Sequence, residues 1–342
     1  MSAEPLEDEI VRRAQRQLER ERRAHLKAVP DDGLIQIGDA VDPWEHDQRR
    51  YRLGIDNVDR SMHPRRAGDL LVIGALSGGG KTSVLEQSAV TNAKAGYRVL
   101  VVSLEMTIAD LQNKMIGREL GCDVHAFERH RSDKTDAYHD AVERLRALPL
   151  KFYRPAPGQS ATIQQIFEVA RRFGADMIAL DYAAKIGGWE PGQSARRIVE
   201  YASAATKETG IYLLLLAQLK QDMLLQKNRP PTMADFEDTK ALAKEATSVL
   251  LIHRPFNGNP KLDTVAEFVC TKNRKFAPSF KAHVFWHGPT TSFFSMTPED
   301  ESHALCCAKK PRPPKKPATP EPRSHDEMTR EEEDAILMDF PI

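Results

Sequence analysis

Long apolar runs, cysteine pairs and an excess of one charge are all missing from this 342-residue sequence. The longest apolar run, Ile211 to Ala217, is far shorter than the roughly 18–20 residues that cross a bilayer. The N-terminus MSAEPLEDEI has no basic start followed by an apolar stretch, so it does not resemble a secretory signal. The 4 cysteines form no CxxC pair, which argues against a zinc site and a disulfide framework. We therefore expect a soluble, cytoplasmic protein without a membrane partner.

Charge is balanced overall, with Lys+Arg and Asp+Glu at 49 each, but both ends of the chain are charge-patterned. Residues 4–28 predict a helix with a thin apolar stripe, which is either a solvated helix or an arm that packs on a neighbouring subunit. Residues 308–323 mix proline with lysine and arginine and cannot bury a core. We divide the chain into an N-terminal helical arm and linker (1–51), an ATPase-sized folded domain (52–297) and a disordered tail (298–342).

Short apolar runs alternate with helical patterns in the folded part. Strands are predicted at Asp69–Gly74, Arg98–Ser103, Leu150–Tyr153, Met177–Asp181, Ile211–Ala217 and Ser248–His253, and helices at 81–95, 107–119, 135–147, 161–173 and 194–208. Such alternation indicates βαβ units, and hence an α/β fold with a mainly parallel sheet and helices on both faces. Later runs at Val265–Thr271, Ala282–Trp286 and Ser292–Ser295 lack helices between them and predict antiparallel hairpins at one edge.

The sequence ALSGGGKT follows the predicted strand DLLVIG and precedes a helix-forming run. Its glycines let the backbone N–H groups face an anion, and the helix N-terminus adds partial positive charge. Lys81 would reach the β- and γ-phosphates of ATP, and the Thr82 hydroxyl would hold Mg²⁺. Ala75 replaces the usual first glycine, and a glycine-rich turn with a chance lysine is the alternative interpretation. The candidate binding residues are Ala75, Leu76, Ser77, Gly78, Gly79, Gly80, Lys81, Thr82 and Ser83.

Three polar residues follow apolar runs and are candidates for the same site. Asp181 ends MIALD and would complete the Mg²⁺ site, although aspartate also caps turns after strands. Glu105 in VVSLEM would orient or deprotonate the attacking water, and Gln218 in LLLLAQ would sense the γ-phosphate. A solvated glutamate and an ordinary turn glutamine are the alternatives. The carboxyl ends of parallel strands share one edge of a sheet, so we expect all three near the P-loop.

The string SLEMTIADLQNKMIGRELGCDVHAF resembles the SLEMS segment of DnaB-type replicative DNA helicases. The resemblance continues through LPLKFYRP, TIQQIFEVARRFG, MIALDY, AQLKQD and CTKNRKFAP, and covers roughly 52–297. It implies a RecA-like P-loop NTPase fold in which Lys81, Thr82 and Asp181 hold ATP and Mg²⁺ and Glu105 is the catalytic base. By the same resemblance Gln218 couples hydrolysis to movement.

In CTKNRKFAP, Lys272 and Arg274 match the family's Lys-x-Arg hairpin, whose cations reach into the neighbouring subunit's site. An arginine suits this role because its planar, always-charged group stabilises the transferred phosphoryl. A merely basic hairpin face is the alternative. Shared sites imply a homo-oligomer, by resemblance a hexameric ring that encloses single-stranded DNA.

Two stretches depart from the family pattern. In 235–247, DFEDTKALAKEAT, Glu237 stands where the family's DNA-facing loop has an arginine, so DNA contact there would use Lys240, Lys244 or backbone amides. About fifty residues precede the core, too few for the family's helical N-terminal domain, which suggests a stand-alone domain of phage or mobile-element type. The terminus EEEDAILMDFPI is similar to the acidic tail of bacterial single-stranded-DNA-binding proteins, which docks replication partners.

The function that these features favour is an ATP-dependent, ring-forming DNA helicase or translocase of replication. A RecA-like DNA-dependent ATPase of recombination or strand handling is the second interpretation. An ATPase-fold adaptor in a replisome is the third, although an adaptor needs no complete hydrolytic set. A replication or recombination protein docking on the C-terminal tip is a further expected partner.

Overall fold

The computed structural model describes residues 49–62, 65–123, 135–156, 158–190, 193–220, 229–237, 240–255, 264–275, 279–297, 299–300 and 302. The predicted arm at 4–28 and the basic and acidic parts of the tail lie outside the described residues. The chain divides into two compact units, Met1–Glu301 and Ser302–Ile342, and every element below belongs to the first.

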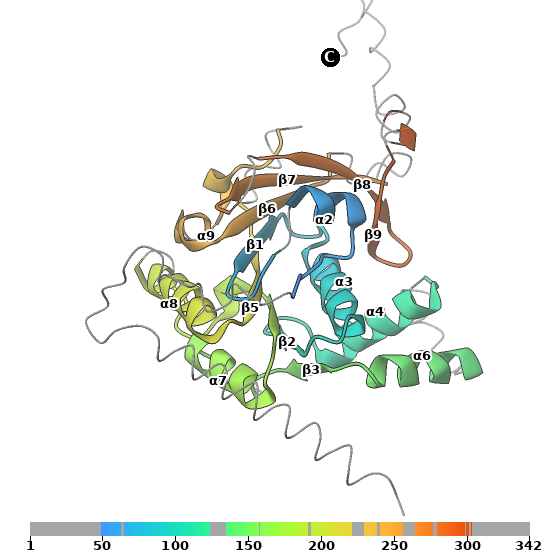
Figure 1. The fold of residues 1–342 in the computed structure, drawn as a ribbon, viewed down its shortest axis with the longest axis horizontal. Helices are drawn as coiled ribbons and strands as arrows, with labels where there is room; N and C mark the ends of the chain where they lie inside the picture. The colour runs from blue at the N-terminus through green and yellow to red at the C-terminus, as the bar shows by residue number, and fades with distance from the viewer. Residues whose placement is uncertain are drawn as a thin grey trace, which may run out of the picture. The chain divides into compact units, whose positions relative to one another are not determined.

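A nine-stranded sheet forms the centre of this unit, in the order β3-β2-β4-β5-β1-β6-β7-β8-β9 (Figure 1). Neighbours from β3 to β6 in this order are parallel, whereas β7, β8 and β9 are added antiparallel. The strands are β1 (Leu70–Ala75), β2 (Val99–Ser103), β3 (Leu150–Tyr153), β4 (Met177–Asp181), β5 (Tyr212–Gln218), β6 (Ser248–His253), β7 (Val265–Asn273), β8 (Lys281–His287) and β9 (Ser292–Ser295). The predicted mixed sheet is confirmed.

Helices cover both faces of the sheet (Figure 1). The helices are α2 (Asp56–Met62), α3 (Lys81–Lys94), α4 (Ile108–Leu120), α6 (Asp136–Arg146), α7 (Ile163–Phe173), α8 (Gln193–Thr209) and α9 (Lys240–Glu245), with 3-10 turns η1 (Ala183–Lys185) and η3 (Met233–Asp235). Side chains of α2, α3 and α4 pack in one apolar cluster, and those of α7, α8 and α9 pack in the other. Along β1, Leu70 and Val72 join the second cluster while Leu71 and Ile73 join the first, because successive strand residues face opposite sides.

The helix boundaries follow from local chemistry. Thr107 accepts a hydrogen bond from the Asp110 amide at the start of α4, and Gly121 ends that helix in the left-handed conformation. Thr162 and Gln165 form a reciprocal capping box before α7. Helices α2 and α9 were not predicted, because they are too short to show a helical period.

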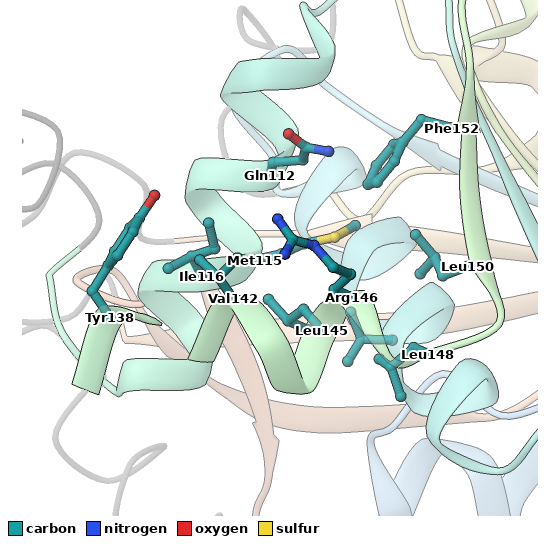
Figure 2. A pocket seen from close by; sticks show the side chains of 11 residues that line it. Gln112, Met115, Ile116, Tyr138, Val142, Leu145, Arg146, Leu148, Leu150 and Phe152 are labelled. Carbon is teal, nitrogen blue, oxygen red and sulfur yellow. The ribbon is translucent and has the colours of Figure 1, made fainter. Parts of the chain in front are cut away.

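An apolar pocket of about 340 Å³ lies between α4, α6 and β3 (Figure 2). None of its lining residues belongs to the P-loop or to the other candidate site residues. Its walls include Val90, Met115, Ile116, Val142, Leu145, Leu148, Leu150 and Phe152. Within the described part of the chain, no helix is both long and apolar enough to cross a membrane.

Candidate nucleotide-binding site

The parallel sheet gathers the predicted site residues at the carboxyl ends of its strands. Ser103 at the end of β2 is level with Asp181 of β4, and Ala75 at the end of β1 is level with Gln218 of β5. In open α/β sheets this edge is where ligands bind. The expectation that these strand ends meet is therefore confirmed by the strand register.

The loop between β1 and α3 has the backbone geometry of a phosphate cradle. Gly78 and Gly80 have φ angles of +72° and +92°, which side chains rarely adopt. The first intrahelical bond of α3 runs from the Val84 amide to the Gly80 carbonyl at 3.1 Å, so the preceding amides are free of the helical ladder. A Cβ on Gly80 would lie 2.6 Å from Phe293 Cζ, so the loop is packed against β9 as well as against its own helix.

Lys81 spans the mouth of this loop. Its Nζ donates to the carbonyl oxygens of Ala75 and Leu76, each at 3.0 Å. Burial lowers the pKa of Lys81, and the charges of Asp181, Glu105 and Glu237 oppose that shift. The ammonium therefore lies where three carboxylates converge, a field that suits the capture of a metal-neutralised phosphate group.

Thr82 and Asp181 provide paired oxygens beside Lys81. The Thr82 hydroxyl donates to Asp181 Oδ2 at 2.7 Å, and Asp181 is 2% exposed. Burial raises the pKa of Asp181, the Thr82 hydrogen bond lowers it, and the Glu105 charge raises it further. A buried carboxylate bonded to a hydroxyl at a helix N-terminus fits the hard, oxygen-ligated Mg²⁺ that accompanies a nucleotide.

Glu105 and Gln218 flank this pair from neighbouring strands. The Leu104 amide donates to the Asp181 carbonyl at 2.8 Å, which places the exposed Glu105 one residue beyond the Mg²⁺ candidate. The Gln218 carbonyl accepts from the Glu237 amide at 3.1 Å. The residue aligned with the DNA-facing loop is thus fixed beside the hydrolysis residues. Sequence reasoning did not place Glu237 there, because the pairing depends on how the 235–247 segment returns to β5.

Arg254 is a second residue at this edge that sequence reasoning missed. Its guanidinium donates to the Gly78 carbonyl at 3.2 Å and lies 4.7 Å from the centroid of the Trp286 ring. It comes immediately after β6, a strand whose carboxyl end shares the P-loop edge. That position was the available signal.

Lys272 and Arg274 are not brought to the P-loop of their own chain. Antiparallel pairing sets Lys272 level with Val249 near the start of β6, so both cations lie at the opposite sheet edge. Lys272 Nζ donates to the Ala243 and Lys244 carbonyls, each at 2.6 Å, and Arg274 also bonds the Lys244 carbonyl. Burial, and next the Arg274 charge, lower the pKa of Lys272 to about 8, while Glu245 opposes the shift. These cations therefore cap the C-terminus of α9 within their own chain.

The sheet order and the glycine loop at the end of β1 define a P-loop protein of the RecA-like class. Residues 52–295 match the family model described as the DnaB-like helicase C terminal domain, and the chain belongs to this family. Its members are ATP-dependent replicative DNA helicases, so the family implies ATP and Mg²⁺.

Curated relatives carry the same assignment at distant identity. The chain is 25% identical over 264 residues to the replicative DNA helicase DnaB of Mycoplasma genitalium, covering 71% of this chain and 56% of that protein. It is 23% identical over 261 residues to the Helicobacter pylori DnaB, covering 70% and 53%. The chain thus spans about half the length of the curated relatives it matches.

Two solved structures share the fold. A DnaB-like replicative helicase, described together with its interactions with primase, superposes with a TM-score of 0.67 at 14% identity, over 78% of this chain and 67% of that one. The ATPase domain of a phage helicase superposes with a TM-score of 0.65 at 15% identity, over 78% of this chain and 98% of that one.

Proposed function

We propose that this chain is an ATP-driven motor that assembles as a ring, by family analogy a hexamer, and translocates on single-stranded DNA in replication. The observation that supports it most is the Thr82–Asp181 hydrogen bond of 2.7 Å beside Lys81, with Glu105 one residue past the β4 neighbour. This set contains a group for each part of phosphoryl transfer on one subunit, except the trans-acting cation.

Within the site, the loop amides and Lys81 would hold the phosphates, and Thr82 with Asp181 would hold Mg²⁺. When bound, Mg²⁺ neutralises charge on the phosphate oxygens. Glu105 would take the proton of the attacking water on its carboxylate. Arg274, with Lys272, would serve the neighbouring subunit, because both lie at the sheet edge opposite their own P-loop.

A second function has one specific observation in its favour. Glu237, in place of the family's arginine, lies on the Gln218 carbonyl and adds negative charge near Lys81. A carboxylate there weakens attraction for a DNA phosphate, which suits a DNA-dependent ATPase that handles strands without processive unwinding. A tail-docked replication or recombination protein is compatible with either function.

The experiment measures ATP turnover with and without single-stranded DNA, for the wild-type protein and for Lys81→Ala. We expect DNA-stimulated turnover in the former and none in the latter. Mass photometry with ATP and DNA should show a ring, and a forked duplex should be unwound. Stimulated turnover without unwinding would favour the second function, and turnover by Lys81→Ala would overturn the P-loop assignment.

A further inference from the structure

Glu86 is a fully buried carboxylate on the P-loop helix that the proposed mechanism does not use. It is 0% exposed, and Arg118 of α4 forms an ion pair with its Oε2 at 3.0 Å. Burial raises the pKa of Glu86, and the charges of Arg118 and Lys114 oppose that shift while Asp181 adds to it. A carboxylate buried this deeply needs its countercharge, because an uncompensated buried charge is strongly destabilising.

Arg118 also reaches a third element, the turn between β8 and β9. Its Nε donates to Ser292 Oγ at 3.0 Å, and its NH2 group donates to the Thr291 carbonyl at 3.0 Å. Thr291 has a φ angle of +47°, and it is a β-branched residue, for which this conformation is costly. Such a conformation persists when its surroundings determine it, and Arg118 supplies two of those bonds.

The joined helices carry the two halves of the hydrolysis site. Glu86 follows Thr82 by four residues, so the two lie on one face of α3. Helix α4 begins shortly after Glu105, and the Ser103 hydroxyl ties that connection by donating to the Met106 carbonyl at 2.5 Å. Since the Glu105 side chain is exposed, its position depends on the backbone and on how α4 lies against α3.

We propose that Arg118 is a positioning residue for ATP hydrolysis, which holds α4 and the β8–β9 turn to Glu86 and thereby sets where Glu105 lies relative to Lys81 and Thr82. The proposal rests on the proposed ATPase function. A displacement of about 1 Å at a reacting group can cost on the order of 10² in rate. Nucleotide affinity, which depends on the loop and α3, should change little.

The test separates positioning from folding. Arg118→Met leaves Glu86 unpaired and should melt at a lower temperature, whereas the double variant Glu86→Leu/Arg118→Met replaces the pair by apolar side chains and should recover the fold. We expect the double variant to bind a fluorescent ATP analogue with wild-type affinity but to lose about 10- to 100-fold in kcat at unchanged KM. Arg118→Lys keeps the charge but lacks the planar fork for Glu86, Ser292 and Thr291, so its kcat should fall less.

Glu119→Gln is the matched control. Glu119 adjoins Arg118 and also links α4 to α3, through Lys94 at 2.8 Å, but on an exposed surface. Its variant should keep wild-type kcat. A folded double variant with wild-type kcat overturns the positioning role. If the double variant does not fold, Arg118→Lys with unchanged kcat overturns it. Wild-type protein without ATP turnover overturns the proposed function and this inference together.

Discussion

Substituting alanine for Gly80 or for Gly78 should have unequal consequences, although both glycines belong to the same loop. Both have positive φ, so alanine at either position costs roughly 1–2 kcal/mol of backbone strain. A Cβ on Gly78 meets nothing within 4 Å, whereas one on Gly80 would lie 2.6 Å from Phe293 Cζ and 3.0 Å from its Cε2. Phe293 is 0% exposed and packs against Trp286 and Phe268, so it cannot withdraw easily.

Overpacking of this kind typically costs about 1–3 kcal/mol, which brings Gly80→Ala to roughly 2–5 kcal/mol in total. For a domain of this size, each kcal/mol lowers Tm by about 2–4 °C. Thermal unfolding followed by circular dichroism should therefore separate the two variants by about 2–12 °C.

A double-mutant cycle with Phe293→Leu tests the cause of that difference. Leucine lacks the ring-tip atoms that a Cβ on Gly80 would meet, so the Gly80→Ala and Phe293→Leu effects should couple by roughly 0.5–3 kcal/mol. Gly78→Ala and Phe293→Leu should be additive. Equal melting shifts for the two glycine variants, or no coupling at Gly80, would refute the packing of β9 against the loop.

Three further outcomes are expected. Glu105→Gln should bind ATP but not hydrolyse it, because the amide cannot take the proton of water; surviving turnover, measured by phosphate release, would point to another carboxylate. Arg274→Ala should lower turnover by on the order of 10³–10⁵, and mixing it with Lys81→Ala subunits should restore some activity; no recovery in verified mixed assemblies would count against a shared site. Glu267→Gln should lower the free energy of unfolding by roughly 1–3 kcal/mol at neutral pH, and chemical denaturation across pH should show that loss shrinking below about pH 4.

The last of these follows from three strands that lie side by side. Burial alone would raise the pKa of Glu267, but hydrogen bonds from His253, His283 and Lys281 outweigh it and hold the pKa well below its ordinary range. A depressed folded-state pKa stabilises the fold above the unfolded-state pKa, and that stabilisation is lost as pH falls through the folded-state pKa. A constant difference between wild type and Glu267→Gln down to acid pH would contradict this assignment.

The sheet and the P-loop were predictable because they depend on local patterns. Runs such as Leu213–Leu216 are buried on both faces, so they read as strands without alternation, and the glycines before Lys81 have a backbone role that a sequence shows directly. The closeness of Thr82 and Asp181 followed from parallel strand order alone. The Arg118 contacts with Ser292 and Glu86 were out of reach, because they join segments far apart in the chain through packing that no local period encodes.

The two cations on the last turn of α9 have a thermodynamic consequence. Lys272 and Arg274 satisfy carbonyls of Ala243 and Lys244 at the end of a helix of 6 residues. If Arg274 serves a neighbouring subunit as proposed, the same guanidinium cannot bond Lys244 at that moment, and the end of α9 loses a donor. Linkage makes the effect reciprocal: whatever holds α9 in its capped form must weaken engagement of the neighbour by the same factor. By resemblance α9 belongs to the segment that faces DNA, so strand contact and subunit contact would draw on one shared side chain.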